Sequence, residues 1–270
     1  MIQLVVTDLD GTLLDDDGHI SDQNVQAIKQ LKDKNILFGI ASGRAKSVIE
    51  KIAKEYNISD HVDIMIGTNG VELSEEGILK DVAVNYLKKD VIIDLYNKFQ
   101  SDDVAFIVHN ENTIICNKST EFTEILRKMN NYKQVIEPNF ENVITENFPR
   151  LIIVGPAKAL KEITDQMSKE KDPNFHFFKS YECFLEAVSN QVSKGNMLKL
   201  YCEHKGINME KVMSIGDNNN DIEMIGACGY GVAVENATKE LKKHAKYSTQ
   251  SNNNHGVAQA IKGYILHPMN

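Results

Sequence analysis

The sequence predicts an α/β fold, in which a mostly parallel sheet carries helices on both faces. Several apolar runs are continuous rather than alternating, as in strands that are buried on both sides. These runs alternate with segments of helical spacing at both ends of the chain, which is typical of parallel sheets. The middle of the chain, from 83 to 187, follows a different pattern. We therefore expect one domain from 1–82 and 188–270, and an inserted second α/β domain from 83–187.

The N-terminal part alternates strand and helix signals. The strand candidates are the apolar runs at 2–6, 36–41 and 63–67. Ser21 is a good N-cap residue, and the apolar residues that follow it recur at helical spacing. A second helix is expected from about residue 45, because Val48, Ile49 and Ile52 would share one face.

The C-terminal part repeats this alternation, whereas the middle mixes short strands with longer helices. At the C-terminal end we expect helices at 194–201, 237–243 and 257–266, strands at 211–215 and 229–234, and a loop at 251–256. In the middle we expect helices near 89–100, 119–130 and 157–169, and strands at 104–109, 113–116, 150–155 and 175–178. The polar residues between 104–109 and 113–116 predict a hairpin.

The charge of the chain limits its partners. The 270 residues carry a net charge of -8, and the sequence pI is about 5.5. Such a chain lacks the basic footprint that nucleic-acid binding needs. An anionic substrate remains compatible with it, because a bound divalent cation reverses the local charge. The acids at 8 and 10 interrupt the first apolar run, and no run reaches the roughly 20 residues of a membrane span. We therefore expect a cytoplasmic protein without a membrane partner.

Two acids, Asp8 and Asp10, follow the first strand and precede Gly11. In a parallel sheet the carboxyl end of a strand is the edge where ligands bind. Two carboxylates this close repel each other unless a proton or a cation holds them. A hard cation such as Mg²⁺ takes oxygen ligands and shares them with phosphate groups. The pair therefore predicts a metal and phosphate site, although a solvated turn with incidental acids explains these few residues equally well.

Polar residues at three other element edges favour the functional interpretation. Ser42 and Gly43 follow the second strand, where a hydroxyl and exposed amides can hold phosphate oxygens. A second acidic cluster at 216–221, which includes Asp217, follows a strand in the C-terminal part. Lys194 begins a predicted helix, where the helix dipole does not favour a cation, so pairing with carboxylates or phosphate would explain it. Each signal alone is weak, but together they predict one site.

These motifs resemble those of the haloacid dehalogenase superfamily of phosphatases. The matching segments are DLDGT at 8–12, Ser42 within ASGR, Lys194 within SKG, and GDNNND at 216–221. The long gap between the second and third motifs, TNG at 68–70 and the segment 251–261 resemble the Cof-type subfamily. The resemblance implies a Rossmann-like core and a C2-type cap domain that covers the substrate. One departure is EAVSNQVSKG, because relatives often carry Pro or Gly before the Val-Ser-Lys.

The resemblance also implies roles for individual residues. Asp8 would be the nucleophile that forms an aspartyl-phosphate, and Asp10 would protonate the leaving oxygen and then activate water. Mg²⁺ would bind to Asp8, to the main-chain carbonyl of Asp10 and to Asp217. Lys194 would neutralise negative charge, and Asp221 would orient Lys194 or a metal-bound water. The residues expected to hold the phosphoryl oxygens are the Leu9 amide, Ser42, Gly43, Lys194 and Asn220.

The expected substrate is a small phosphorylated metabolite such as a sugar phosphate, with Mg²⁺ as cofactor. Polar and aromatic residues of the insert that could contact it are His109, His176, Lys179 and Tyr181. Two alternatives share the pocket. One is a phosphotransferase or mutase of the same superfamily, and the other is a sensor that binds phosphorylated metabolites without turnover. A receiver domain would be about half as long. The oligomeric state is left open.

Overall fold

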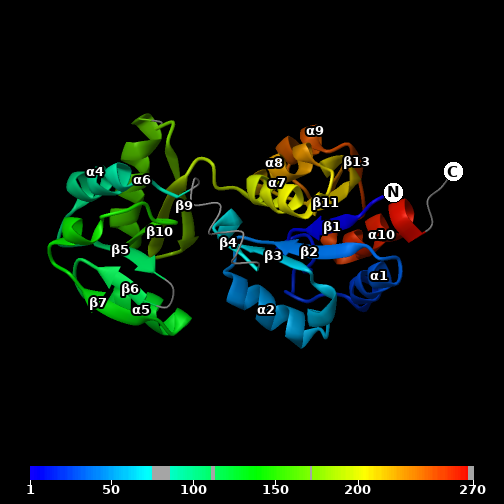
Figure 1. The fold of residues 1–270 in the computed structure, drawn as a ribbon, viewed down its shortest axis with the longest axis horizontal. Coiled ribbons are helices and arrows are strands. Elements are labelled where there is room, and N and C mark those ends of the chain that lie inside the picture. The colour runs from blue at the N-terminus through cyan, green and yellow to red at the C-terminus, as the bar shows by residue number, and fades with distance from the viewer. Residues whose placement is uncertain (75–85, 111–112, 171, 267–270) are drawn as a thin grey trace. The chain divides into compact units, whose positions relative to one another are not determined.

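The computed structural model describes residues 1–74, 86–110, 113–170 and 172–266. The chain divides into two compact units, shown in Figure 1. Unit 1 contains Met1–Lys80 and Ser193–Asn270, and unit 2 contains Asp81–Val192. Among the described residues, no helix has both the length and the apolar character that a membrane crossing needs.

Unit 1 is built around a seven-stranded sheet. In spatial order its strands are β13 (Tyr247–Ser248), β12 (Tyr230–Ala233), β11 (Val212–Gly216), β1 (Leu4–Thr7), β2 (Leu37–Ala41), β3 (Ile64–Gly67) and β4 (Glu72–Leu73). All neighbours run parallel except β3 and β4. Every residue of β1 and β11 is buried, which explains why their sequences are almost continuously apolar.

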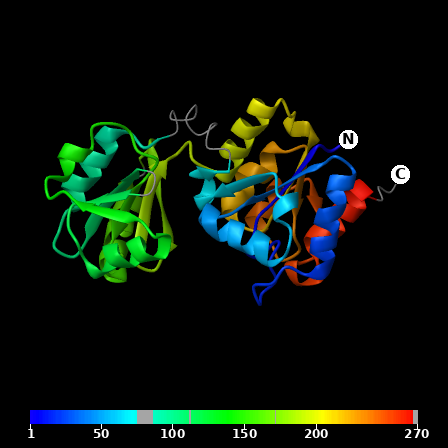
Figure 2. The ribbon, with the colours of Figure 1, turned by 60° about the horizontal axis from the view of Figure 1, so that its bottom comes forward.

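Helices cover both faces of this sheet (Figures 1 and 2). One face carries α1 (Asp22–Asp33), α2 (Lys46–Glu55) and α10 (Gly256–Ile261), and the other carries α7 (Lys194–Lys205), α8 (Ile222–Ala227) and α9 (Lys239–His244). This arrangement confirms the predicted fold class. The chain moves from β1 outward to β3 in one direction and from β11 to β13 in the other. The order therefore reverses between β1 and β11, where open α/β sheets form their crevice.

The helix signals in the sequence correspond to buried faces, with one exception. The Ser21 hydroxyl accepts a hydrogen bond from the amide of Asn24 and caps α1 as predicted. In α2 the residues that reach the core are Ile49 and Ala53. Placing Val48 on the buried face was wrong, because this side chain is 36% exposed. Val48 adjoins Ile49 in sequence and lies about 100° away from it around the helix.

Unit 2 contains a six-stranded mixed sheet. Its strands in spatial order are β7 (Lys133–Ile136), β6 (Thr113–Cys116), β5 (Ala105–Asn110), β8 (Leu151–Val154), β10 (Phe184–Ser189) and β9 (Phe175–Tyr181). The predicted hairpin is confirmed, since β5 and β6 pair antiparallel. Helices α4 (Lys89–Phe99) and α6 (Ala157–Glu170) pack on one face, and α5 (Glu121–Asn130) packs on the other.

Two strands of unit 2, β7 and β10, were not predicted from the sequence. The four residues of β7 include only one that is even half-buried, so the strand lacks an apolar pattern. In β10 the acid Glu186 interrupts the apolar run. Its carboxylate is buried against Arg150 at 2.8 Å, which makes a charged strand residue tolerable. Because β10 continues to Ser189, the sheet of the insert extends two residues past the boundary expected at 187. The boundary expected at 82 lies outside the described residues.

The loop at 251–256 fixes the segment that follows the first strand. The buried Asn252 side chain donates to the carbonyl of Leu14 at 3.2 Å and to the carboxylate of Asp16 at 2.9 Å. The backbone amide of Asn252 donates to the side-chain oxygen of Asn236. The side-chain amide of Asn236 in turn donates to the carbonyl of Gly11 at 2.8 Å. These hydrogen bonds join the segment 11–16 to residues 236 and 252, and so fix the chain that follows Asp8 and Asp10.

We expect Asn252→Ala to lower the free energy of unfolding by about 1–3 kcal/mol, because the buried Leu14 carbonyl loses its donor. Urea denaturation of the variant and the parent measures the change. Asn254→Ala is the matched control, since the exposed Asn254 side chain donates to the hydroxyl of Ser251 and to no other group in the described ranges. Equal midpoints for the two variants would contradict the structural role of Asn252.

Candidate active site

The carboxyl ends of four parallel strands bring polar residues to one edge of unit 1. Asp8 follows β1, Ser42 follows β2, Thr68 follows β3 and Asp217 follows β11. Because β1, β2, β3 and β11 are neighbours in the sheet, these four positions lie side by side. Asp8 and Asp217 flank the point where the strand order reverses, which is the expected place for a ligand.

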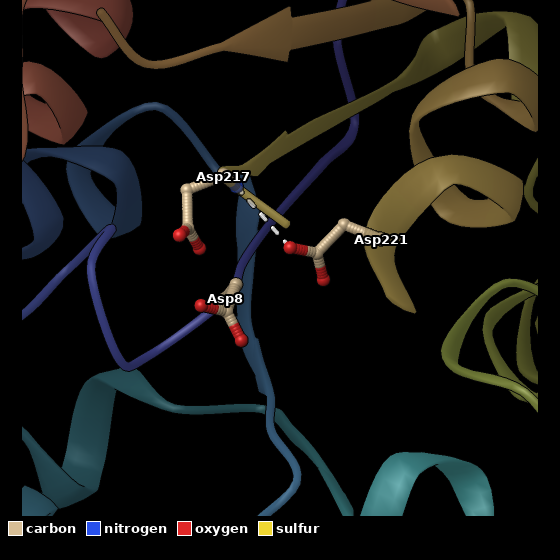
Figure 3. Close-up of side chains that lie close together, drawn as sticks. All are labelled: Asp8, Asp217 and Asp221. Carbon is tan, nitrogen blue, oxygen red and sulfur yellow. Dashed lines mark hydrogen bonds between the residues drawn. The ribbon is translucent and has the colours of Figure 1, made fainter. Parts of the chain in front are cut away.

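Three carboxylates converge at this edge (Figure 3). Asp8, Asp217 and Asp221 each offer an oxygen atom, and these atoms all lie within 4.8 Å of one another. Asp8 and Asp221 are buried, and Asp217 is partly buried. One Asp221 oxygen accepts hydrogen bonds from the amides of Asp217 and Asn218, at 3.2 and 3.1 Å. The backbone after β11 therefore holds Asp221 in a fixed orientation.

Lys194 brings a positive charge into the cluster. This residue is 1% exposed, and its Nζ atom donates to Oδ1 of Asp8 at 2.5 Å and to Oδ1 of Asp221 at 2.7 Å. It is the first residue of α7, which begins after the N-cap Ser193. The unfavourable position of a cation at a helix start is thus compensated by two carboxylates.

Burial and mutual repulsion perturb the acids of the cluster. Burial raises the pKa of Asp8 well above its ordinary value, and Asp221 raises it further, whereas Lys194 acts in the opposite direction. Burial and Asp221 also raise the pKa of Asp217. For Lys194, burial alone would lower the pKa, but attraction to Asp8 and Asp221 outweighs burial and raises it. The lysine is therefore charged, and burial and mutual repulsion disfavour ionisation of Asp8 and Asp217 in the absence of a cation.

The turn at Gly11 lets Asp217 approach the first strand. Gly11 has a φ of 77°, and a Cβ atom here would lie 2.8 Å from a carboxylate oxygen of Asp217. The neighbouring Thr12 donates its hydroxyl to the other Asp217 oxygen at 3.1 Å. Gly11 therefore allows a sharp turn here, and a side chain at this position would displace the acid from the cluster.

Asp10 lies apart from the acidic cluster. Its side chain is 51% exposed and forms a bidentate pair with Arg44, from Nε at 2.9 Å and from the terminal nitrogen at 2.5 Å. Both carboxylate oxygens of Asp10 therefore accept from the guanidinium of Arg44. For Asp10 to donate a proton, this pair has to open.

The residues expected to hold phosphate lie around the same edge. Ser42 is buried, and its hydroxyl accepts from the amide of Arg44 at 3.0 Å. Gly43 and Asn220 are exposed, whereas the Leu9 side chain is fully buried, so that only its backbone can face a ligand. The structure thus gathers Asp8, Lys194, Asp217 and Asp221 by direct contact, and arranges the others along the neighbouring loops.

Four residues at this edge were not singled out from the sequence. Arg44 binds Asp10, Thr12 binds Asp217, Asn236 binds the carbonyl of Gly11, and Asn69 accepts from Asn220 at 3.0 Å. Arg44, Thr12 and Asn69 adjoin or fall within the motifs that the sequence displays, so their position was the available signal. Asn236 had none, because its role arises from a contact between positions 225 residues apart.

The model of the haloacid dehalogenase-like hydrolase family matches residues 5–261. The chain belongs to the haloacid dehalogenase-like hydrolases. YcsE of Bacillus subtilis (strain 168), a 5-amino-6-(5-phospho-D-ribitylamino)uracil phosphatase, is 28% identical over 98% of this chain and 96% of its own. YxeH of the same organism, whose designation as a phosphatase is provisional, is 26% identical over 98% and 99% of the two chains.

Solved structures agree with this membership. A haloacid dehalogenase-like hydrolase from Bacteroides thetaiotaomicron has a TM-score of 0.73 and 28% identity, over 97% of this chain and 99% of its own. TM0651 from Thermotoga maritima has a TM-score of 0.72 and 28% identity, over 97% of each chain. The family resemblance seen in the sequence is confirmed, and so is the predicted class of enzyme, a phosphatase of the haloacid dehalogenase type.

We expect Asp8→Asn to stabilise the cation-free hydrolase at neutral pH, because Lys194 keeps the carboxylate of Asp221 as a charged partner while the buried charge of Asp8 is removed. A carboxyl with a raised pKa keeps its proton in the folded state at pH values where the unfolded chain has lost it. Its ionisation therefore lowers stability as the pH rises above the ordinary pKa of 3.8. In EDTA the variant should melt above the parent at pH 7, and the difference should shrink toward pH 4.

Added Mg²⁺ should then stabilise the parent more than the Asp8→Asn variant, because only the parent offers the full set of carboxylates. Asp17→Asn, which changes an exposed acid in a loop, is the matched control and should respond to pH and Mg²⁺ like the parent. Thermal melts of the three proteins supply both comparisons. A lower melting temperature for Asp8→Asn in EDTA at pH 7 would show that ionised Asp8 stabilises the fold.

Proposed function

We propose that this chain hydrolyses small phosphate monoesters with Mg²⁺ as cofactor, through a phosphoryl group carried on Asp8. The observation that supports this most is the position of the Asp8 carboxylate. It lies at the carboxyl end of the central strand, in contact with a buried lysine and within ligand distance of two further acids. Phosphoryl transfer asks mainly for such positioning and charge compensation.

The acidic cluster fits a divalent cation. Lys194 is the only buried lysine or arginine among the described residues of unit 1, and the two carboxylates that it contacts belong to a cluster of three. Oxygen donors are the ligands of Mg²⁺. We propose that Asp8, Asp217 and the main-chain carbonyl of Asp10 hold the ion. When bound, Mg²⁺ supplies positive charge that lowers the repulsion between an anionic nucleophile and an anionic substrate.

Asp221 is better suited to orienting Lys194 than to binding the cation. One of its oxygens accepts from Lys194, and the other accepts from two backbone amides. These bonds use most of the acceptor capacity of the carboxylate. We therefore assign Asp221 a positioning role in the site, consistent with the first of the two roles expected from the resemblance.

In the first step a carboxylate oxygen of Asp8 attacks phosphorus, and the bond between phosphorus and the ester oxygen breaks. The leaving oxygen takes a proton from Asp10 and departs as an alcohol. In the second step Asp10 takes a proton from water as the water attacks phosphorus. The bond between phosphorus and the Asp8 oxygen breaks, which releases inorganic phosphate and regenerates the carboxylate.

The remaining residues hold the phosphoryl group while its bonds change. Lys194 neutralises part of the charge on Asp8 and on the phosphoryl oxygens. Ser42, the amides of Leu9 and Gly43, and Asn220 supply hydrogen bonds. Arg44 binds both oxygens of Asp10. A phosphate ester that enters the site would offer this guanidinium a second anionic partner.

The substrate class proposed here is a small phosphorylated metabolite. YcsE, which matches the chain over nearly its full length, is named for a phosphorylated intermediate of this size. We also propose that the insert, unit 2, acts as the cap that the resemblance implies. In such a role it would contact the part of the substrate remote from phosphorus.

We expect Asp8→Asn to abolish turnover while the fold persists, because an amide oxygen cannot form the covalent intermediate. Phosphate release from p-nitrophenyl phosphate with Mg²⁺ should fall at least about 10³-fold, and circular dichroism should stay unchanged. Asp17→Asn should keep full activity. Persistent turnover by purified Asp8→Asn would refute the nucleophile. A parent that releases no phosphate from a broad panel of phosphomonoesters would instead indicate a sensor.

The acid role of Asp10 predicts a dependence on the leaving group. An alkyl phosphate needs a proton on its departing oxygen, whereas p-nitrophenolate leaves without one. We expect Asp10→Ala to lower kcat/KM for alkyl phosphates by about 10²–10⁴-fold, and to lower it much less for p-nitrophenyl phosphate. Equal losses for both substrates would mean that Asp10 does not donate the proton.

A further inference from the structure

The segment Thr68–Gly70, directly after β3, has an unusual backbone. Thr68 has a φ of 48° and Asn69 a φ of 54°, and Gly70 follows with a φ of 106°. Asn tolerates the left-handed region, but for a β-branched residue such as Thr this conformation is an outlier. Consecutive strained residues persist only where the surroundings enforce them, and they concentrate at functional sites.

The surroundings that enforce this conformation belong to the candidate active site. The amide of Thr68 donates to the carbonyl of Arg44, and the amide of Asn69 donates to the carbonyl of Ser42, both at 2.9 Å. Gly70 packs against the start of α7, since a Cβ atom here would lie 2.4 Å from the carbonyl oxygen of Ser193. The segment therefore ties the Ser42 loop to the helix that begins at Lys194.

The Asn69 side chain extends this connection to the loop after β11. Its Oδ1 atom accepts a hydrogen bond from Nδ2 of Asn220 at 3.0 Å. The Asn69 amide group lies next to Gly43, with Nδ2 and Oδ1 each 3.4 Å from where a Cβ atom of that glycine would be. The described part of the chain provides no acceptor for this Nδ2 group. A donor pair thus remains free beside the loop that we assign to phosphate binding.

We propose that Asn69 is a positioning residue, which holds Asn220 against the Ser42–Gly43 loop and adds a hydrogen-bond donor for a phosphoryl oxygen. This inference rests on the proposed function and adds a residue to the site from a fourth strand end. Asn220 is exposed, so without Asn69 nothing described in its surroundings fixes its side chain. Asn69 acts on the bound phosphate group and leaves the nucleophile and its lysine untouched.

Asn69→Gly tests this assignment, because glycine accepts a φ of 54° without strain and only the side chain is lost. The matched control is Asn57→Gly. Asn57 has the same φ of 54°, is exposed, and lies at the end of α2. The measurements are kcat/KM for p-nitrophenyl phosphate and the inhibition constant of inorganic phosphate, with thermal melts for both variants.

We expect Asn69→Gly to weaken inhibition by inorganic phosphate roughly 10-fold, and to lower kcat/KM by a similar factor, as for the loss of hydrogen bonds to a charged group. Asn57→Gly should leave both unchanged. Asn220→Ala, which alters an exposed side chain, should resemble Asn69→Gly. The double variant should lose little more than the stronger single variant, because the two side chains act as one unit.

Three outcomes would overturn the assignment: Asn69→Gly behaving like Asn57→Gly, Asn220→Ala leaving phosphate inhibition unchanged, or fully multiplicative effects in the double variant. Each of these results requires an active parent and is therefore distinct from failure of the proposed function. A parent that is inactive on every phosphomonoester overturns the proposed function and this inference together.

Discussion

The contact between Lys194 and the carboxylates of Asp8 and Asp221 is the interaction on which the site depends. A fully buried ammonium group is costly unless its donors meet charged acceptors, and this lysine has two. The pairing joins three segments of the chain, namely the end of β1, the start of α7 and the turn after β11. A shift in any of these segments would leave a buried charge without its partner, so the site and the packing around it are specified together.

The parallel sheet determines where these segments can meet. Parallel strands present all their carboxyl ends at one edge. Because the strand order reverses between β1 and β11, the helices that follow these two strands, α1 and α8, lie on opposite faces of the sheet and leave space between them. The loops after β1 and β11 can approach each other only where a side chain is absent. Gly11 meets this requirement at the turn beside Asp217. The loops behind the edge are stabilised by side-chain amides, as Asn252 shows by binding both Leu14 and Asp16.

Much of the fold could be predicted because burial imposes patterns on the sequence. The buried strands β1, β2, β3 and β11 produce continuous apolar runs, and α1 has a recognisable cap at Ser21. Short or exposed elements impose no such pattern, which is why β4, β7 and β13 were missed. The acids and the lysine could be found because each is anomalous for its local position. Contacts made by ordinary residues, such as Asn236 with Gly11, depend on the tertiary fold and leave no local signal.

The two units show two ways of burying charge, and the difference identifies the site. In unit 2 the buried Arg150 pairs with Glu186 and also donates to His109 at 3.2 Å. Burial, together with Arg150, lowers the pKa of His109 to about 3, so this histidine is neutral beside the ion pair. Its partners make His109, a candidate substrate contact from the sequence, part of the packing of the insert. In unit 1 Lys194 pairs with two of three clustered carboxylates. Burial first, and repulsion from Asp221 second, raise the pKa values of Asp8 and Asp217. The buried charge pair of unit 2 thus joins a cation to an anion, whereas in unit 1 acids lie next to one another, where a cation from solution would offset their repulsion.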